Sequence, residues 1–247
     1  MKRIGLIGGM SWESTAVYYK HINEEVRRLM GDGLASADLC LRSVNFSEIV
    51  AQQKAGRWDL AAETLISVAR ELEQCGCAMV LICTNTMHIL ADEVQAAIDI
   101  PLIHIAEVTG AAVKKAGKKR PLLLATRYTM EKPFYVGYLK DHFGLDPVIP
   151  GEADRATVHD VIFEEICCGV LSGASRERYI AIAERARQKG ADCIIFGCTE
   201  VGLLVRPDDF DIPSFDSTLL HAEAAVRFSL EDELSAEGKE SRPVPVH

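Results

Sequence analysis

The sequence contains no uninterrupted apolar run of the roughly 20 residues that a membrane-spanning helix needs, and aromatic residues make up only 6% of it. We therefore expect no membrane partner. The N-terminal segment MKRIGLIGG begins with basic residues but lacks the long apolar stretch and the cleavage site of a secretion signal. It is better explained as a first strand that enters a glycine turn, and we expect a cytoplasmic location.

Positive charge is also scarce. The chain has 27 lysine and arginine residues against 36 aspartate and glutamate residues, which gives a formal net charge of −9. An acidic surface of this kind argues against nucleic acid or an anionic membrane as the main partner. The basic run at residues 118–120 is too short to change this, and we interpret it as a solvated turn before a strand.

Paired cysteine motifs are missing although the chain has eight cysteines. Cys75 and Cys77 are separated by a single glycine, and Cys167 is followed directly by Cys168. Neither arrangement has the spacing of a zinc site, and no secretion signal supports a disulfide framework. We therefore expect no metal ion, and we interpret most of the thiols as small buried hydrophobic groups.

Short apolar runs alternate with amphipathic stretches from one end of the chain to the other. The runs are rich in valine, isoleucine and leucine and are mostly continuous, which is typical of parallel strands covered on both faces. The stretches between them carry apolar residues at helical spacing. The sequence therefore predicts an α/β fold. The runs that we expect to form strands are residues 3–8, 39–46, 78–83, 102–105, 121–125, 147–149, 192–196 and 213–215.

An internal repeat indicates how these elements are organised. Residues 76–86 align without a gap on residues 190–200, and the motif Asp-Ile-Pro recurs at residues 99–101 and 211–213. We therefore predict two pseudosymmetric lobes, each a mainly parallel four-stranded sheet flanked by helices, with the active site in the cleft between them. The Asp-Ile-Pro strands are candidates for crossing over to the opposite lobe.

The domain boundaries follow from this organisation. We assign residues 1–100 together with 209–231 to the first lobe, because the last helix is expected to return to it, and residues 101–208 to the second lobe. Residues 232–247 lose the periodicity and are dominated by serine, glutamate, lysine, glycine and proline. We expect this tail to be disordered.

The repeat also pairs two residues that could move a proton. Thr84 aligns with Cys198, and each follows a buried strand at the point where a helix should begin. Ligands bind at the carboxyl ends of parallel strands, so pseudosymmetric lobes would hold the two side chains on opposite sides of one cleft. Two opposed proton-handling groups suit the inversion of a stereocentre.

The chemistry of these positions leaves alternatives open. A thiol at a helix N-terminus has a lowered pKa and is a usable base near neutral pH, although Cys198 could instead be an ordinary buried cysteine. Cys83 is chemically a better acid-base group than Thr84 but lies one residue out of register. Asn85, Thr86 and Thr199 could bind a substrate carboxylate at helix N-termini or simply cap those helices. We interpret His88 as structural, and Glu165 and Glu200 remain unassigned.

Several motifs together give the chain a family resemblance. The segments Cys83-Thr-Asn-Thr-Met-His88 and Gly197-Cys-Thr-Glu200 each follow an apolar strand, and Gly5–Met10, Ser11–Thr15 and Ala125–Met130 fit the same pattern. Over roughly residues 2–230 the sequence resembles the aspartate/glutamate/hydantoin racemase family. The resemblance implies two α/β lobes, no pyridoxal phosphate, no metal, and proton transfer at Cα between two residues that are usually cysteines. It also implies a homodimer, as in many members of the family.

The first motif departs from the usual family pattern Cys-Asn-Thr, because Thr84 stands before Asn85. In this respect the sequence is similar to the branch of aspartate/glutamate-specific or broad-specificity amino-acid racemases. That similarity implies that Thr84 and Cys198 are catalytic, with Cys83 in reserve for Thr84. It further implies that the substrate contacts Met10, Gln53, Asn85, Thr86 and Thr199.

The expected activity is therefore cofactor-independent interconversion of L- and D-amino acids. Residues 43–53, which should lie near the cleft, contain neither arginine nor lysine, although a side-chain carboxylate usually needs one of them. This weakens an aspartate-only specificity. The alternatives are an isomerase that acts on hydantoin or maleate, and a non-catalytic amino-acid-binding or regulatory protein on the same fold.

Overall fold

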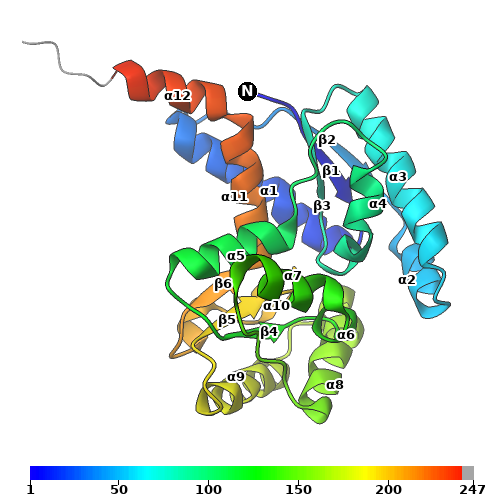
Figure 1. Cartoon of the computed structure of the whole chain (residues 1–247), viewed down its shortest axis with the longest axis vertical. Coiled ribbons are helices and arrows are strands. Elements are labelled where there is room, and N and C mark those ends of the chain that lie inside the picture. The colour runs from blue at the N-terminus through cyan, green and yellow to red at the C-terminus, as the bar shows by residue number, and fades with distance from the viewer. Residues whose placement is uncertain (241–247) are drawn as a thin grey trace, which may run out of the picture.

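The computed structural model describes residues 1–240 and contains two separate parallel sheets (Figure 1). The first has the strand order β2-β1-β3 and the second the order β4-β5-β6. The strands are β1 (Ile4–Gly8), β2 (Leu39–Ser43), β3 (Met79–Ile82), β4 (Pro121–Leu124), β5 (Cys193–Phe196) and β6 (Ser214–Asp216). The predicted α/β fold with two lobes is confirmed.

Each sheet has three strands, one fewer than expected. The predicted strands at residues 102–105 and 147–149 are reduced to single parallel bridges, between Val80 and Leu102 and between Leu122 and Val148. With these bridges included, the two sheets have equivalent orders, because Leu102 extends the first sheet beside β3 and Val148 extends the second beside β4. The prediction of four strands in each sheet is thus wrong, because the fourth segment forms a single bridge rather than a strand. The fourth segment nevertheless lies where a fourth strand was expected, next to its own sheet.

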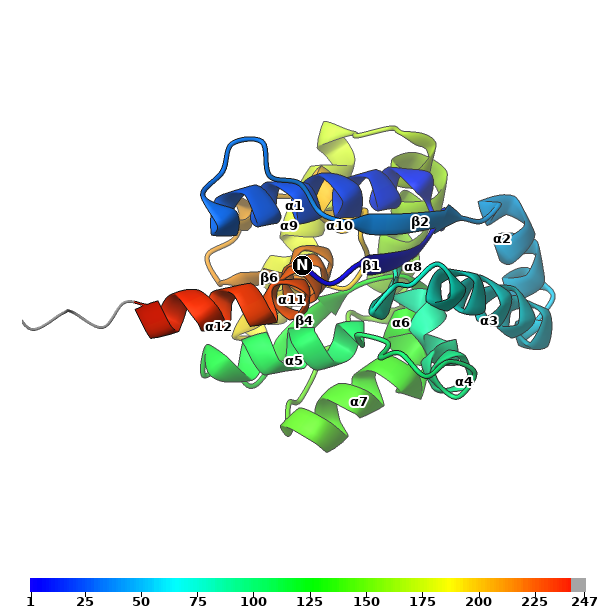
Figure 2. The ribbon, with the colours of Figure 1, turned by 90° about the horizontal axis from the view of Figure 1, so that it is seen from above.

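Helices cover both faces of each sheet (Figures 1 and 2). Those that precede β4 in the chain are α1 (Trp12–Met30), α2 (Phe46–Lys54), α3 (Trp58–Gln74), η1 (Thr86–Leu90), α4 (Ala91–Gln95) and α5 (Ile105–Lys115). Those that follow it are α6 (Arg127–Glu131), α7 (Pro133–Phe143), α8 (Glu152–Asp160), η2 (Val161–Glu165), η3 (Ile166–Cys168), α9 (Gly173–Gln188), α10 (Val201–Leu204), η4 (Pro207–Asp209), α11 (Ser217–Ser229) and α12 (Glu231–Glu240). This double cover buries every residue of β1, β3, β4 and β5.

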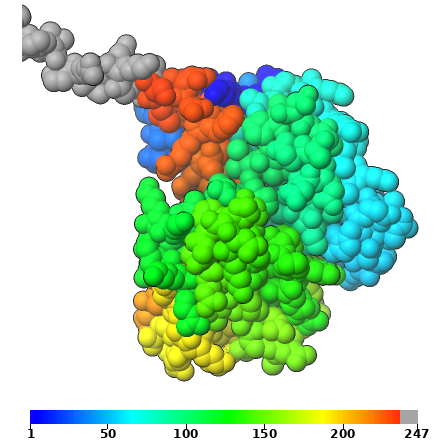
Figure 3. Space-filling view, in the orientation of Figure 1, coloured from blue at the N-terminus to red at the C-terminus, as the bar shows by residue number. Residues whose placement is uncertain are grey.

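Two helices exchange lobes. Ile105 and Val113 of α5 belong to the core of the second lobe, whereas Ala222 and Val226 of α11 belong to the core of the first. The two crossing helices pack against each other, and α11 also packs against α1 (Figure 2). The space-filling view shows the lobes in contact over this face (Figure 3). The helices that follow the Asp-Ile-Pro segments therefore cross over, and the segments themselves stay in their own lobes, which corrects our expectation.

The crossing helices lie in the lobes to which the expected boundaries assign them, but two strand segments depart from those boundaries. Residues 214–216 form β6 and pair with β5, so the second lobe extends past residue 208. Leu102 still pairs with the first sheet, so the first lobe extends past residue 100. Residues 231–240 form the helix α12. The prediction of a disordered tail from residue 232 is therefore wrong for residues 232–240. The remainder of the expected tail, residues 241–247, lies outside the described residues.

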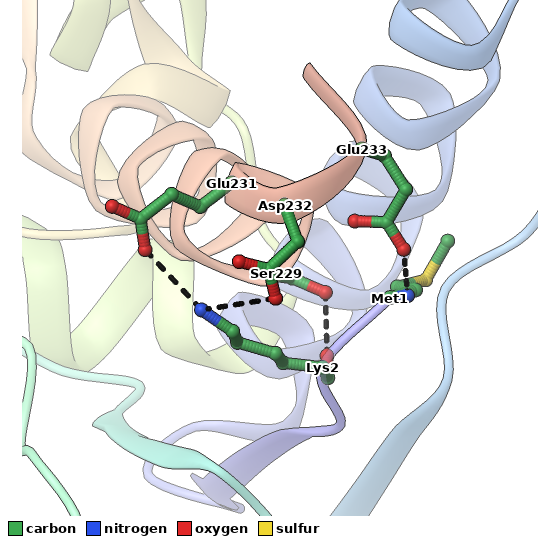
Figure 4. A network of polar contacts seen from close by, with 6 residues as sticks. All are labelled: Met1, Lys2, Ser229, Glu231, Asp232 and Glu233. Atoms are coloured by element: carbon green, nitrogen blue, oxygen red, sulfur yellow. Dashed lines mark hydrogen bonds and ion pairs between the residues drawn. The ribbon is translucent and has the colours of Figure 1, made fainter. Parts of the chain in front are cut away.

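A polar network ties the start of the chain to the junction between α11 and α12 (Figure 4). The backbone N–H of Lys2 donates to the carbonyl of Ser229 at 2.8 Å. The Lys2 ammonium lies 3.2 Å from Glu231 and 3.5 Å from Asp232, and the amino group of Met1 pairs with Glu233. Exposed ion pairs of this kind contribute little stability individually. Together they hold the entry to β1 against the returning helix.

Gly9 shapes the turn that leads from β1 towards the lobe interface. Its φ is +91°, and a Cβ added there would lie 2.3 Å from the carbonyl oxygen and 2.6 Å from the nitrogen of Val44. We expect Gly9→Ala to lower the free energy of unfolding by about 2–4 kcal/mol, because it adds backbone strain to a clash with main-chain atoms. Urea denaturation measures the loss. The matched control is Gly56→Ala, where φ is +70° but no atom lies within 4 Å; equal losses in the two variants would contradict this explanation.

Candidate active site

A pocket lies between the lobes at the carboxyl ends of the strands, where parallel sheets bind ligands. Its cavity volume is about 20 Å³, so the lobes lie close together here, and both contribute to its wall. The residues that line it are Met10, Phe46, Gln53, Thr84, Thr86, Met87, Thr126, Ile162, Phe163, Cys167, Cys198 and Glu200. Five residues singled out from the sequence are therefore brought together here: Met10, Gln53, Thr84, Thr86 and Cys198.

Thr84 and Cys198 reach this pocket from opposite lobes. Thr84 follows the end of β3 by two residues, and Cys198 follows the end of β5 by two residues. The alignment of the repeat thus corresponds to equivalent places in the two sheets. Because both side chains line one cavity, a small molecule between the lobes could meet a hydroxyl on one side and a thiol on the other.

The thiol of Cys198 is hydrogen-bonded to a buried carboxylate. Its Sγ donates to Oε2 of Glu200 at 2.9 Å, and the hydroxyl of Thr199 donates to the same oxygen at 2.5 Å. The other oxygen, Oε1, accepts from the hydroxyl of Ser11 at 2.7 Å. Glu200 is only 3% exposed, so these contacts satisfy a carboxylate that has little access to water.

This environment reverses our prediction about the thiol. Burial and the neighbouring carboxylate of Glu200 raise the pKa of Cys198 well above its usual value. The helix that follows, α10, has only four residues and does not supply the expected stabilisation of a thiolate. Cys198 is therefore a thiol at neutral pH that is hydrogen-bonded to Glu200.

Cys83 is not part of the pocket. Its side chain is fully buried in the first-lobe core with residues of α1 and α11. Burial raises the pKa of this thiol far above its usual range. The structure therefore does not support Cys83 as the reserve for Thr84, which is the residue of this pair that faces the cavity.

Two hydrogen bonds cross from one lobe to the other in a nearly symmetric way. Ser11, which caps α1, bonds Glu200 of the second lobe. Thr126, which caps α6, lies 2.9 Å from the hydroxyl of Thr86 in the first lobe. In the alignment of the repeat, Thr86 and Glu200 are counterparts. The scaffold is thus symmetric while the chemistry is not, because only the Cys198 side carries a carboxylate.

The other predicted contacts divide between the pocket and its surroundings. The Nε2 of Gln53 lies 2.9 Å from the sulfur of Met87, and both line the pocket. Asn85 donates instead to the hydroxyl of Ser217 at 3.0 Å, and its Oδ1 is buried without a partner. Thr199 is occupied by Glu200. Asn85 and Thr199 therefore lie behind the pocket wall.

Comparison with known proteins identifies the family. The family model described as Asp/Glu/Hydantoin racemase matches residues 7–225. The chain belongs to this family. It is therefore a member of a group of racemases that act on small molecules, and the predicted resemblance is confirmed.

Individual relatives agree with this assignment. The chain is 22% identical to the broad specificity amino-acid racemase RacX of Bacillus subtilis over 233 residues, which cover 90% of this chain and 96% of the relative. It is 45% identical to a candidate Asp/Glu racemase from Yersinia pestis of known crystal structure, with a TM-score of 0.87 and coverage of 93% and 100%. An aspartate racemase homologue from Pyrococcus horikoshii OT3 is 30% identical, with a TM-score of 0.80 and coverage of 93% and 99%. Within residues 1–240, no helix is long and apolar enough to cross a membrane.

In this racemase-family chain, His88 holds the backbone of Thr84. Its Nδ1 lies 2.8 Å from the carbonyl oxygen of Thr84, and its Nε2 accepts from the N–H of Ile105 at 3.2 Å. Both contacts are satisfied by the neutral ring with its proton on Nδ1. Since Ile105 is the first residue of the crossing helix α5, His88 links the position of Thr84 to the junction between the lobes.

Two further histidines surround this link. The ring of His88 lies 4.9 Å from that of His104 and 5.6 Å from that of His221. His221 contacts the carbonyl oxygen of Ile103 at 2.7 Å and the hydroxyl of Tyr18 at 2.8 Å. Burial lowers the pKa of His104 to about 4 and that of His221 to about 3. The cluster is therefore uncharged at neutral pH.

This burial makes stability depend on pH. Below the usual histidine pKa of 6.5 the unfolded chain binds protons that folded His104 and His221 do not. Their contribution is fully present above pH 6.5 and is lost as the pH falls to about 4 for His104 and to about 3 for His221. As the pH falls from 6.5 to 4, we expect the free energy of unfolding of His104→Asn to decrease by about 2 kcal/mol less than that of the native chain. Urea denaturation at the two pH values measures both decreases. Equal decreases in the two proteins would show that burial of uncharged His104 does not cause the pH dependence.

Proposed function

We propose that the chain is an amino-acid racemase that works without pyridoxal phosphate and uses Thr84 and Cys198 on opposite faces of Cα. The observation that carries the proposal is that these two residues occupy equivalent places in the repeat and line one pocket from opposite lobes. Membership of a racemase family supports the reaction class. The relative from Bacillus subtilis supports an amino acid as the substrate.

The polar groups in the pocket suit the two ends of such a substrate. Thr86 and Thr126 both line the cavity, with their hydroxyls 2.9 Å apart, and could donate to an α-carboxylate. Cα would then lie between Thr84 and Cys198. Several donors to the carboxylate also lower the barrier to removal of the Cα proton, because negative charge moves onto the carboxylate when that proton leaves.

The first proton transfer can proceed through groups that are already in contact. Cys198 passes its proton to Glu200, and the thiolate removes the proton from Cα. Thr84 then donates its hydroxyl proton to the opposite face of the carbanion. When the product leaves, the Thr84 oxygen takes a proton from water and Glu200 gives one back to water. In the reverse direction Thr84 first loses its hydroxyl proton to water, its oxygen removes the proton from Cα, and the thiol of Cys198 delivers a proton to the opposite face. A threonine hydroxyl is a weak base, so we propose that the two directions differ in kcat and KM while the ratio of their kcat/KM values stays at one.

The direct test is to incubate the purified chain with single L- and D-amino acids in the absence of pyridoxal phosphate. Chiral chromatography should show conversion of either enantiomer to the racemate. Tight binding of amino acids without inversion would instead favour the non-catalytic binding protein. We keep the homodimer as a prediction, which analytical ultracentrifugation tests.

A further inference from the structure

The wall of the pocket carries no basic side chain among the residues that the structure describes. Its one charged residue is Glu200, and its remaining polar groups are hydroxyls, thiols and the amide of Gln53. The three donors that contact the Glu200 carboxylate are two hydroxyls and a thiol, and none of them is a cation. The cavity therefore offers an anionic environment to whatever side chain the substrate brings.

A second carboxylate would be poorly accommodated here. A substrate already brings one carboxylate on its Cα, for which the hydroxyls of Thr86 and Thr126 are available. Burying a further carboxylate requires a cation or several N–H donors, and a like charge nearby opposes it. Glu200 is such a like charge, and no side chain in the wall supplies the cation.

The basic residues next to wall residues in sequence lie outside the wall. Lys54 follows Gln53 and is exposed. Arg127 follows Thr126, yet its guanidinium lies 3.8 Å from Glu131, and its side chain is 48% exposed. Arg42, at the end of β2, pairs with Glu71 at 2.9 Å on the surface. Neither belongs to the wall of the pocket.

Apolar side chains make up the rest of the wall. Phe46 comes from α2, Met87 from η1, and Ile162 and Phe163 come from η2 of the opposite lobe, with Met10 beside them. These groups can surround an uncharged side chain from both lobes and remove it from water, which favours binding in proportion to the apolar area that is buried. Methionine side chains also adapt to differently shaped apolar groups.

We infer that the pocket selects amino acids with uncharged, mainly apolar side chains, such as leucine and methionine, over aspartate and glutamate. This inference rests on the proposed racemase function and specifies its substrate class. The charge of the wall, rather than its size, is the basis of the selection. A change that adds a cation to the wall should therefore shift the preference.

The first experiment compares kcat/KM for racemisation of methionine, leucine, aspartate and glutamate by the native chain. We expect the uncharged substrates to be preferred by at least about 10-fold. A preference for aspartate or glutamate would overturn the inference while leaving the racemase proposal intact. Failure to racemise any of them would overturn the proposed function itself, and the inference with it.

The second experiment introduces a cation where the wall is polar. Gln53 is buried on α2 and lines the pocket, whereas Ala51 lies on the exposed side of the same helix. Gln53→Arg should raise the ratio of kcat/KM for aspartate over methionine by about 10-fold. The control Ala51→Arg adds the same charge outside the pocket and should leave the ratio unchanged. An unchanged ratio in folded Gln53→Arg, or equal shifts in both variants, would overturn selection by the charge of the wall.

Discussion

Replacing Cys198 by alanine should lower kcat/KM for racemisation by about 10³-fold in both directions, because one of the two proton carriers is lost. Each direction needs Cys198 once, as the base for one enantiomer and as the acid for the other. The substitution removes one atom, the sulfur that bonds Glu200 within the pocket. Chiral chromatography with each enantiomer as the starting material measures the loss.

The matched control for this loss is another cysteine of the same chain. Cys75 is an exposed free thiol outside the pocket, and Cys75→Ala should retain the native rate. Circular dichroism of both variants separates a lost proton carrier from a lost fold. Native rates in a folded Cys198→Ala variant would remove Cys198 from the mechanism.

Replacing Glu200 by glutamine should lower kcat/KM by about 10²-fold, although the amide has nearly the same size and still bonds to its neighbours. The carboxylate accepts the thiol proton at 2.9 Å, and an amide cannot hold that proton. Glutamine also removes a negative charge that raises the pKa of Cys198. The thiol should therefore become more acidic while the enzyme becomes slower.

These two opposite effects distinguish a proton acceptor from a structural contact. Alkylation of Cys198 by iodoacetamide, followed by peptide mass spectrometry, should begin at lower pH in Glu200→Gln than in the native chain. The control is Glu165→Gln, which removes a carboxylate that bonds Ser175 away from the pocket wall. Glu200→Gln with native kinetics, or with an alkylation profile shifted to higher pH, would contradict the role of Glu200.

Local sequence pattern predicted the elements better than it predicted their partners. The continuous apolar runs located the strands, because residues covered on both faces must all be apolar. The expected boundaries already placed α5 in the second lobe and α11 in the first, where their core residues lie. Pattern did not specify that the Asp-Ile-Pro segments before these helices stay in their own lobes. The tail shows a related limit. Its acidic start at residues 231–233 suits a helix N-terminus, and this local preference outweighed the polar composition that suggested disorder.

The candidate site also has features that the sequence predicted and features that it did not. The repeat located Thr84 and Cys198, because equivalent strand ends in a duplicated fold face a common cleft. The raised pKa of Cys198 could not be predicted, since it depends on burial and on the direction of the Glu200 side chain. The sequence displayed Glu200 two residues after the cysteine, but its role became visible only through the contacts in three dimensions. Phe163 reaches the pocket from a segment with no motif of its own, whereas Thr126 lies in the motif at residues 125–130 but was not singled out there.

The central claim is that two different groups act on opposite faces of Cα, and racemisation in D₂O tests it most directly. Starting from one enantiomer, early product of opposite configuration should carry deuterium at Cα while the remaining substrate stays protiated, because the proton removed on one side is not the one returned on the other. Proton NMR after chiral separation reads both pools. Early deuterium in recovered substrate, or product that retains the original proton, would show a single group serving both faces and would contradict the account.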